Sequence, residues 1–420
     1  MKGHPVLDAL AGAGIRLGLA RMREFLGTLG NPQGAFPVLH IGGTNGKGSV
    51  AQILGAILLA SGRRVGVHTS PHLQTVNERI RFDGVPISDD QLGPVIERID
   101  RARQAWAAAA QLTDEPYPLT YFEFTVACVF EALAEANVDV GVIEVGMGGR
   151  LDATNVVTPR VAAIVSIGLD HCDELGSDHA SIAGEKAGII KPGVPVVVGP
   201  LPADALQVIR SVAAERNAPL HVWGIDFEGF GSVNDFRYSG RHTWEGLAVG
   251  LLGDHQLINA GVALRVLELS GMEVTESALR AGLANARHPG RLDWLGAHLL
   301  VDGAHNPPGA TTLANYLAAL PHDRRRTLVL GGGTDKDIRG VAATLAPVVD
   351  RIFTTAGTHE RARSAAQIAA ECEGLPVPVT AAGPIKDALK AARIDDDLVI
   401  VAGSLYLVGE VRDLVGAAPA

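Results

Sequence analysis

Cysteine is scarce in this sequence, and the few cysteines lie far apart. Cys128, Cys172 and Cys372 show no C-x-x-C spacing, so the sequence predicts neither a disulfide framework nor a zinc knuckle. Reduced cysteines that pack as small apolar side chains are typical of cytoplasmic proteins. We therefore expect a cytoplasmic location.

Signals for membrane insertion and export are also missing. Apolar runs such as residues 53–60 and 161–167 are too short to cross a bilayer, which takes about 20 residues. The N-terminal sequence MKGHPVLDALAGAG lacks the basic segment, apolar core and small-residue cleavage site of a signal peptide. We expect a soluble protein without a membrane partner.

Positive charge is in deficit, since 36 Lys and Arg stand against 46 Asp and Glu and give a formal net charge of −10. This balance argues against a nucleic-acid partner. The chain is 47% hydrophobic and 20% charged and contains 50 glycines, which is typical of a globular enzyme rich in turns. At 420 residues it exceeds what one hydrophobic core usually supports, so two domains are expected.

The most informative stretch is HIGGTNGKGSV at residues 40–50. It follows a short apolar strand and precedes a helix predicted from Ser49 to about Ala60. Its glycines allow the backbone N–H groups to turn inward as an anion cradle. Lys47 adds a positive charge, and the helix directs the positive end of its dipole to the same place. The stretch therefore favours a phosphate-binding loop.

The match to the general phosphate-loop pattern G-x-x-x-x-G-K-[ST] is imperfect. Ile41 replaces the first glycine, Gly48 follows the lysine directly, and the hydroxyl comes one place late at Ser49. A purely structural glycine turn is thus still open from this stretch alone. If the loop does bind phosphate, the hydroxyl that holds a metal ion has to come from elsewhere.

Strand-like apolar runs alternate with helical patterns over the first part of the chain. The strands at 37–41 and 65–67 flank a helix, and this β-α-β unit implies parallel pairing. The runs 138–145 and 161–167 are apolar throughout most of their length, as in strands buried on both faces. We predict an α/β fold with a mostly parallel, doubly wound sheet. Residues 219–253 alternate more loosely and form either an antiparallel edge or a small β subdomain.

A second alternation of strands and helices begins at Leu299, after the break His288-Pro289-Gly290. We therefore expect a first domain over residues 1–287 and a smaller α/β domain over residues 288–420.

Polar side chains follow four strands of the predicted first sheet. Lys47, Ser70, Glu144 and His171 each lie at or just after the end of a strand, and ligands of parallel sheets bind at this edge. Such an oxygen-rich set with one nitrogen suits a hard divalent cation that also contacts phosphate. Two of these residues also have a simpler explanation: Ser70 precedes Pro71 and fits a turn, and an isolated histidine such as His171 is often structural. Glu144 is harder to explain in that way, because a charge that closes an apolar strand needs a partner.

Further polar groups follow Glu144 and the strands of the second domain. Arg150 and Asp152 lie in a second glycine-rich loop, which forms either a wall of the same site or a salt-bridged turn. Lys186 lies among small and apolar residues, where a lysine stem often lies along the surface. Residues 302–307 (DGAHNP) and 331–336 (GGGTDK) give the second domain its own polar edge.

Together these segments make the chain resemble the folylpolyglutamate synthases and dihydrofolate synthases, the folate branch of the Mur ligase superfamily. No single block is specific, but their number and order are. The matching blocks are GTNGKGS at 43–49, SPHL at 70–73, NERI at 77–80, EVGMGGRLDATN at 144–155, LDH at 169–171, EKAGI at 185–189, GDHQLINA at 253–260, HPGRLDWL at 288–295, DGAHNP at 302–307, GGGTDKD at 331–337 and GSLYLVGEVR at 403–412.

The resemblance implies an ATP-dependent amide ligase with an N-terminal P-loop domain, like the central domain of Mur ligases, and a Rossmann-like C-terminal ligase domain. In such enzymes ATP phosphorylates a substrate carboxylate, and the amine of L-glutamate then attacks the acyl phosphate. The substrates implied are L-glutamate, dihydropteroate and tetrahydrofolate derivatives, with ATP and Mg²⁺. A monomer is expected.

The resemblance also implies individual roles. The loop would hold the ATP phosphates, three side chains would ligate Mg²⁺, one lysine would be carbamylated, and two amides would lie near adenine. In the second domain an arginine would contact phosphate, a carboxylate would serve the ribose or a hinge, and a histidine would face glutamate and the γ-phosphate. The phosphate-binding loop comprises Gly43, Thr44, Asn45, Gly46, Lys47, Gly48 and Ser49, and the Mg²⁺ ligands are Ser70, Glu144 and His171. The carbamylated lysine is Lys186, and the amides near adenine are Gln256 and Asn259. In the second domain the arginine is Arg291, the carboxylate is Asp302 and the histidine is His305.

The leading hypothesis is a bifunctional enzyme that adds glutamate to dihydropteroate and then to folates, with Lys47, Lys186, Arg291 and His305 as catalytic residues. A monofunctional folylpolyglutamate synthase is the nearest alternative, because no dihydropteroate-specific residues can be identified. A P-loop switch or kinase without ligase activity, and a murein ligase, are more distant alternatives.

Overall fold

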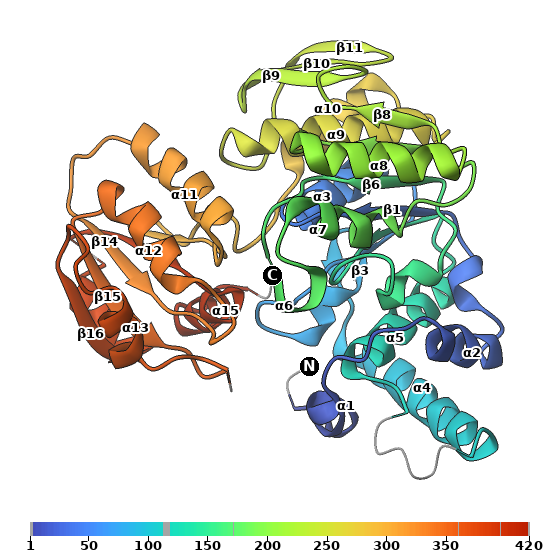
Figure 1. Cartoon of the computed structure of the whole chain (residues 1–420), viewed down its shortest axis with the longest axis horizontal. Coiled ribbons are helices and arrows are strands. Elements are labelled where there is room, and N and C mark those ends of the chain that lie inside the picture. The colour runs from blue at the N-terminus through green and yellow to red at the C-terminus, as the bar shows by residue number, and fades with distance from the viewer. Residues whose placement is uncertain (1–2, 112–117, 171, 360, 395, 419–420) are drawn as a thin grey trace. The chain divides into compact units, whose positions relative to one another are not determined.

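The computed structural model describes residues 3–111, 118–170, 172–359, 361–394 and 396–418 (Figure 1). The chain divides into two compact units. The first comprises Met1–Ser70, Val76–Gly250 and Gln256–Arg287, and the second comprises Pro71–Thr75, Leu251–His255 and His288–Ala420. Besides residues 288–420, the second unit therefore contains two short segments from earlier in the sequence.

The first unit is built on an eight-stranded sheet with the strand order β4-β3-β2-β5-β1-β6-β7-β8. All pairs from β2 to β8 are parallel, and β3 and β4 add an antiparallel edge. The strands are β1 Val38–Gly42, β2 Val65–His68, β3 Arg81–Phe82, β4 Val85–Pro86, β5 Val140–Glu144, β6 Val161–Ile164, β7 Val196–Val198 and β8 Leu220–Val222. Every residue of β1, β5, β6 and β7 is buried. The predicted α/β class with a mostly parallel sheet is confirmed.

Helices of this unit pack their apolar residues against the sheet. Among the described residues, one apolar cluster includes residues of α2, α4 and α5, and another includes residues of α7 and α8. The helices are α1 Pro5–Leu10, α2 Ala20–Thr28, α3 Lys47–Ala60, α4 Asp89–Ala109, α5 Tyr121–Glu135, α6 Cys172–Leu175, α7 His179–Ala187, α8 Ala203–Glu215, α9 His255–Leu269 and α10 Glu276–Asn285, with the short 3₁₀ turns η1 Ala11–Ala13, η2 Pro32–Gly34, η3 Val76–Arg79 and η4 Ala153–Val156. Among the described residues, none of the helices combines the length and apolarity needed to span a membrane.

Local sequence explains where several helices begin. Ser88 and Thr120 cap α4 and α5 through capping boxes with Gln91 and Glu123, which satisfies backbone N–H groups at both helix starts. The spacing of apolar residues predicts a helix from Ile15, but α2 begins only at Ala20. The reason is Gly18, whose φ of 143° lies outside the helical region.

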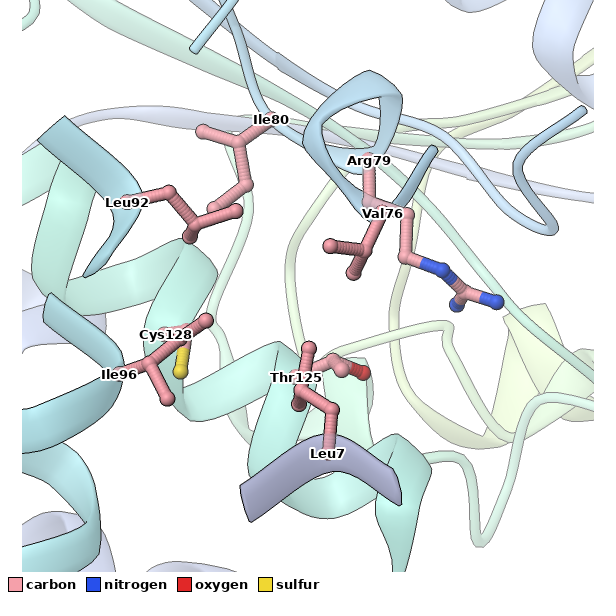
Figure 2. Close-up of a pocket in the computed structure, with 8 residues that line it drawn as sticks. All are labelled: Leu7, Val76, Arg79, Ile80, Leu92, Ile96, Thr125 and Cys128. Carbon is pink, nitrogen blue, oxygen red and sulfur yellow. The ribbon is translucent and has the colours of Figure 1, made fainter. Parts of the chain in front are cut away.

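The core beneath α4 and α5 contains a small pocket, lined by Leu7, Val76, Arg79, Ile80, Leu92, Ile96, Thr125 and Cys128 (Figure 2). Its walls are apolar because the two polar side chains are used elsewhere. The hydroxyl of Thr125 donates to the carbonyl of Phe122 at 3.0 Å, and the guanidinium of Arg79 lies over the ring of Tyr121. The pocket is therefore a gap in side-chain packing and offers nothing to bind a polar ligand.

Residues 228–247 form a separate three-stranded antiparallel sheet. The sequence had left open whether residues 219–253 form an antiparallel edge or a small β subdomain. The strands are β9 Glu228–Ser232, β10 Asp235–Ser239 and β11 Thr243–Leu247, with β10 in the centre. Residues 220–222 instead form β8 at the edge of the main sheet. The stretch is therefore a small β subdomain (Figure 1).

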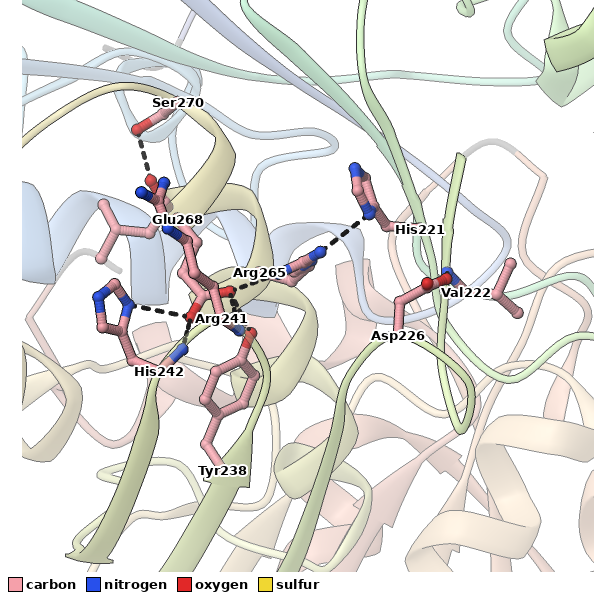
Figure 3. A network of polar contacts seen from close by, with 10 residues as sticks. His221, Val222, Asp226, Tyr238, Arg241, His242, Arg265, Glu268 and Ser270 are labelled. Atoms are coloured by element: carbon pink, nitrogen blue, oxygen red, sulfur yellow. Dashed lines mark hydrogen bonds and ion pairs between the residues drawn. The ribbon is translucent and has the colours of Figure 1, made fainter. Parts of the chain in front are cut away.

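A buried carboxylate fastens this small sheet to α9 (Figure 3). The side chain of Glu268 is 2% exposed and accepts hydrogen bonds from the hydroxyl of Tyr238 at 2.9 Å, the backbone N–H groups of Arg241 and His242 at 3.2 and 2.8 Å, and the guanidinium of Arg265 at 2.8 Å. Arg265 also bonds to the ring of His221 in β8, the edge strand of the main sheet. One carboxylate thus ties β10, the β10–β11 turn and α9 together.

The second unit has a six-stranded sheet with the order β12-β13-β17-β14-β15-β16, parallel except for β12. Its strands are β12 Asp293–Trp294, β13 Leu299–Val301, β14 Arg326–Leu330, β15 Arg351–Ala356, β16 Val379–Pro384 and β17 Leu398–Ala402. Its helices are α11 Pro307–Ala319, α12 Ile338–Leu345, α13 Ala365–Glu371, α14 Ile385–Ala392 and α15 Leu405–Leu414, with the 3₁₀ turn η5 Ala346–Val348. Apolar clusters lie on both faces of the sheet, as the predicted second α/β fold requires.

The role of Glu268 gives a stability prediction. Glu268→Ala should lower the free energy of unfolding by roughly 3–5 kcal/mol, because it leaves a buried guanidinium without its carboxylate. Tyr238→Phe, which removes a single donor, should cost about 1 kcal/mol. Urea unfolding followed by circular dichroism measures both. Arg241→Ala is the control, since only the backbone N–H of Arg241 is used; a loss as large as that of Glu268→Ala in this control would contradict the account.

Candidate active site

The glycine-rich loop leaves β1 after Gly42 and leads directly into α3. Gly43 has a φ of 142° and Gly46 a φ of 85°, conformations that side chains other than glycine rarely adopt. The left-handed Gly46 caps the helix, so α3 begins at Lys47 rather than at the predicted Ser49. The N-terminal end of α3 therefore lies at the end of the loop, where a helix directs its first backbone N–H groups outward.

The space around two glycines is as restrictive as their backbone angles. A Cβ atom built on Gly46 would lie 2.4 Å from Oδ1 of Asn259, and one on Gly43 would lie 3.1 Å from the backbone nitrogens of Val165 and Ser166. The loop thus packs directly against α9 on one side and against the chain that follows β6 on the other. Side chains at these positions would push it out of place.

The chain after β6 also holds the loop by hydrogen bonds. The backbone N–H of Thr44 donates to the carbonyl of Ser166 at 2.9 Å, and the backbone N–H of Asn45 donates to the hydroxyl of Ser166 at 2.9 Å. The hydroxyl of Thr44 donates to the carbonyl of Gly168 at 3.1 Å. Ser166 is thus a supporting residue that the sequence analysis missed; its position just after a buried strand is the signal that could have revealed it.

Two lysines converge on carbonyl groups of this loop. The ammonium of Lys47 donates to the carbonyl of Thr44 at 3.1 Å, and that of Lys186 donates to the carbonyl of Gly43 at 3.0 Å. Lys186 is 4% exposed. Burial lowers the pKa of Lys186 to about 7, and the nearby charge of Lys47 acts in the same direction. Lys186 is therefore a buried amine that is partly neutral near pH 7, not a surface lysine.

The loop after β5 places Lys186 by packing against α7. A Cβ atom on Gly149 would lie 2.8 Å from the carbonyl of Glu185, so only glycine permits this close approach. The backbone N–H of Arg150 donates to the same carbonyl at 2.7 Å, and the Arg150 guanidinium pairs with the Glu185 carboxylate at 2.7 Å. The sequence left open whether the loop of Arg150 forms a wall of the site or a salt-bridged turn, and the structure shows Arg150 in a salt bridge. Asp152 is buried, and burial raises its pKa.

Ser70 and Glu144 meet at the carboxyl ends of β2 and β5. The backbone N–H of Ser70 donates to Oε2 of Glu144 at 3.0 Å, and Glu144 is 5% exposed. This carboxylate and the adjacent hydroxyl are hard oxygen donors of the kind that a divalent cation prefers. His171, the third predicted ligand, lies outside the described residues. Within those residues no group of three His, Cys, Asp or Glu side chains is arranged to hold a metal.

Gln256 and Asn259 from α9 are packed against the loop and the first turn of α3. The side chain of Gln256 donates to the hydroxyl of Ser49 at 3.3 Å, and the amide of Asn259 donates to Gln256 at 2.8 Å. Gln256 and Asn259 are 1% and 4% exposed. The structure therefore brings the predicted amide pair to the glycine loop and shows that it supports the loop.

Within the second unit, the predicted residues gather at the end of β13. The buried carboxylate of Asp302 accepts the backbone N–H groups of Leu292 and Ala304 at 2.7 and 2.8 Å. Burial raises the pKa of Asp302, and the neighbouring Arg291 charge opposes this shift. Nδ1 of His305 donates to the carbonyl of Gly303 at 2.7 Å, which fixes the orientation of the ring. Asp302 thus clamps the turn that carries Arg291.

Comparison with known proteins assigns both parts of the chain to one superfamily. Residues 113–267 match the Mur ligase middle domain, and residues 290–405 match the Mur ligase glutamate ligase domain. The class defined by these domains is the ATP-dependent Mur-type ligase, and the chain is an enzyme of this class.

Individual relatives narrow the assignment. The dihydrofolate synthase/folylpolyglutamate synthase of Bacillus subtilis is 34% identical over 95% of both chains. The structure of Mycobacterium tuberculosis folylpolyglutamate synthase complexed with ADP and AMPPCP is 34% identical, with a TM-score of 0.92 over 99% of this chain and 98% of that one. The structure of the Yersinia pestis bifunctional folylpolyglutamate synthase/dihydrofolate synthase complexed with AMPPNP and Mn ion is 35% identical, with a TM-score of 0.86 over 98% of this chain and 96% of that one. The chain belongs to the family of dihydrofolate synthases and folylpolyglutamate synthases.

The geometry of Gly46 gives a prediction about nucleotide binding. Gly46→Ala should weaken binding of a non-hydrolysable ATP analogue roughly tenfold or more, because the new methyl group displaces the loop. Isothermal titration calorimetry measures the affinity.

Gly62→Ala is a matched control, since Gly62 has a similar φ of 81° but has no atom within 4 Å of the new Cβ position. It should cost about 1 kcal/mol of stability from backbone strain and leave the affinity unchanged. Equal affinities of the two variants would refute the proposed steric requirement.

Proposed function

We propose that this ligase adds L-glutamate both to dihydropteroate and to reduced folates, through an acyl-phosphate intermediate. The observation that carries the proposal is the glycine loop with Lys47 and Lys186 bonded to its carbonyl groups, in a chain whose two domains match the Mur ligase family. Residues 1–287 are assigned to ATP binding and residues 288–420 to ligation. We also propose a cytoplasmic monomer.

The electrostatic problem in this reaction explains the residues around the loop. A substrate carboxylate and a triphosphate repel each other, so their approach needs fixed positive charge and directed N–H groups. The N-terminal end of α3 and the ammonium of Lys47 supply both. We assign phosphate binding to the seven residues from Gly43 to Ser49, and adenine-proximal positions to Gln256 and Asn259.

Mg²⁺ is the metal ion that we propose for the pair formed by Ser70 and Glu144, with His171 as a further ligand. The pair fits such an ion, because the backbone N–H of Ser70, a residue that carries a hydroxyl, bonds to the buried carboxylate of Glu144 at a strand edge. When bound, Mg²⁺ would neutralise negative charge on the phosphates. The chain's own contribution is to orient Glu144 through the backbone N–H of Ser70.

Lys186 is proposed to act as a carbamate. Carbamate formation needs a neutral amine, and burial provides one by lowering the lysine pKa to about 7. The reaction joins the Lys186 nitrogen to the carbon of CO₂ and releases one proton. The product is an acidic group that replaces a cation close to Asp152 and Asp170, which are among the charges that act on Lys186.

In the second unit we assign phosphate contact to Arg291, a ribose or hinge role to Asp302, and contact with glutamate and the γ-phosphate to His305. The clamp that Asp302 forms on the turn after Arg291 supports a positioning role. A P-loop switch or kinase would have no use for these residues, which argues against that alternative.

The test of the proposed function is a pair of ligation assays, with dihydropteroate and with tetrahydrofolate, each supplied with ATP and L-glutamate. Both should yield one more glutamate per product and release phosphate, and Lys47→Ala should abolish both activities while the fold is retained. Mass spectrometry and circular dichroism measure these outcomes. Activity on tetrahydrofolate alone would leave a monofunctional folylpolyglutamate synthase, and activity on neither would refute the proposal.

Lys186 gives a separate prediction. Lys186→Ala should lose activity, and short carboxylic acids that fit the vacated space should restore part of it. In the wild-type protein, a ¹³C-carbamate signal should grow as pH rises through about 7 at constant CO₂ pressure, because the neutral amine fraction rises with pH. Lys191→Ala is a control, since Lys191 bonds to the carbonyl of Asn155 instead. A Lys186→Ala variant that is active without added acid would contradict the carbamate.

A further inference from the structure

Asp152 ends a chain of three buried side chains that begins in the middle of β1. Nε2 of His40 lies 2.9 Å from the hydroxyl oxygen of Thr154, and this hydroxyl donates to Oδ1 of Asp152 at 2.5 Å. His40 and Thr154 are 0% exposed, and Asp152 is 6% exposed. All three residues belong to the first unit. These side chains form a buried relay, in which each hydrogen bond depends on the next.

The direction of the relay follows from the number of protons in it. An ionised carboxylate only accepts hydrogen bonds, so Thr154 donates its single hydroxyl proton to Asp152. Nε2 of His40 then has to carry the ring proton and donate it to Thr154. Burial lowers the pKa of His40 to about 3, and the charges of Lys191 and His68 act in the same direction. The ring is therefore neutral near pH 7, with one N–H, and Nδ1 is an acceptor.

Reversing the relay would leave a buried donor without an acceptor. A protonated Asp152 would donate to Thr154, Thr154 would donate to Nε2 of His40, and the ring proton would have to move to Nδ1. Among the described residues, Nδ1 of His40 is buried and has no hydrogen-bond partner. An orphaned N–H group is rarer inside folded proteins than an unused lone pair. The relay thus favours the charged form of Asp152.

Backbone N–H groups hold the same carboxylate. The N–H of Thr154 donates to Oδ1 of Asp152 at 3.0 Å, and the N–H of Met147 donates to Oδ2 at 2.9 Å. Burial raises the pKa of Asp152, and these bonds and the Thr154 hydroxyl oppose that shift. Both carboxylate oxygens are therefore fixed in place at the start of η4.

The loop that carries Asp152 lies directly on the part of α7 that carries Lys186. A Cβ atom on Gly149 would lie 3.0 Å from Cα of Lys186. The backbone N–H of Asp152 donates to the carbonyl of Gly149 at 3.3 Å, so Asp152 follows a tight turn that begins at this contact. The amine of Lys186 and the carboxylate of Asp152 are thus placed on two segments in close contact.

Few charges act on the buried amine of Lys186. The positive charge of Lys47 lowers the pKa of Lys186, and the negative charges of Asp170 and Asp152 raise it. The carboxylate of Glu185, the preceding residue in α7, is already paired with a guanidinium. Asp152 is therefore a nearby negative charge whose ionisation depends on a buried relay.

We infer that His40 and Thr154 are positioning residues that hold Asp152 in its charged form beside Lys186, so that Asp152 sets how firmly Lys186 keeps its proton. This rests on the proposed role of Lys186. A charged Asp152 stabilises the ammonium and repels the anionic carbamate, so the relay raises the pH at which the carbamate forms. His40 and Thr154 act on the amine only through Asp152.

The test follows the ionisation of Lys186 by NMR of protein labelled with [ε-¹³C]lysine, in buffer free of CO₂. The chain contains seven lysines, and Lys186→Met assigns the signal. In the wild type Lys186 should titrate with a pKa of about 7. Thr154→Val keeps the shape of the side chain and removes the hydroxyl. It should lower the Lys186 pKa by about half a unit or more, because less of Asp152 is charged.

Variants of His40 separate hydrogen-bond donation from packing. His40→Gln can place an amide N–H near the position of Nε2 and should leave the Lys186 pKa within about 0.2 units of the wild type. His40→Phe cannot donate and should act like Thr154→Val, which it replaces if that variant does not fold. Equal Lys186 titrations in the two His40 variants would overturn the inference.

Thr125→Val is a matched control, because it removes the hydroxyl of another buried threonine of the first unit, which donates to the carbonyl of Phe122 instead. It should leave the titration of Lys186 unchanged. A shift as large as that of Thr154→Val would show a general effect of core substitution and contradict the relay.

A double-mutant cycle tests whether the effect passes through Asp152. Asp152→Asn should lower the Lys186 pKa at least as much as Thr154→Val, and Thr154→Val should have no further effect in that background. An Asp152→Asn variant in which Lys186 titrates as in the wild type would overturn the inference, and so would a full additional shift in the double mutant.

The same variants under ¹³CO₂ connect the relay to the carbamate. The ¹³C-carbamate signal should appear at lower pH in Thr154→Val and Asp152→Asn than in the wild type, because more of the amine is neutral and less negative charge faces the product. If the wild type forms no carbamate at any pH, the proposed carbamate fails, while the titrations without CO₂ still decide whether His40 and Thr154 hold the charge of Asp152.

Discussion

The glycine loop has to expose backbone N–H groups without side chains, and several contacts in the first unit depend on this requirement. An anion cradle made of N–H groups works only where side chains are absent and the loop is rigid. A loop without side chains cannot hold itself in place, however, so its rigidity comes from neighbours. Ser166 fixes it from the end of β6 and Asn259 from α9. Glu268 in turn connects α9 to Tyr238 of β10 and to the backbone of His242.

Burial of Lys186 is the second constraint at the site. A buried ammonium is unfavourable, and the positive charge of Lys47 makes it more so. The fold nevertheless keeps the amine there, through the close contact of Gly149 with α7 and the bond to the carbonyl of Gly43. Such an arrangement costs stability, which makes sense if the amine is chemically changed or used in the reaction.

The sequence was sufficient to predict the features that depend on local pattern. Buried parallel strands are continuous apolar runs, so β1, β5 and β6 were recognisable, and so was the edge at which Lys47, Ser70 and Glu144 lie. Helix limits that depend on a single backbone angle were less accurate: Gly18 delays α2, and Gly46 starts α3 early. The position of Ser166 after a buried strand marks it as a candidate, but its partners in the loop could not be predicted, because these contacts join residues more than a hundred positions apart.

The division of the chain into units also depends on contacts between residues distant in sequence, which the sequence pattern does not reveal. Composition and pattern place a boundary near residue 288, but they contain no sign that residues 71–75 and 251–255 belong with the residues beyond it. Membership of a unit is decided by tertiary contacts such as those of Gln74 with Arg412 and Asp413. Both segments border proposed site residues, Ser70 in one case and Gln256 in the other. The places where sequence reasoning fails are thus concentrated beside the site, where contacts distant in sequence have to hold functional groups in position.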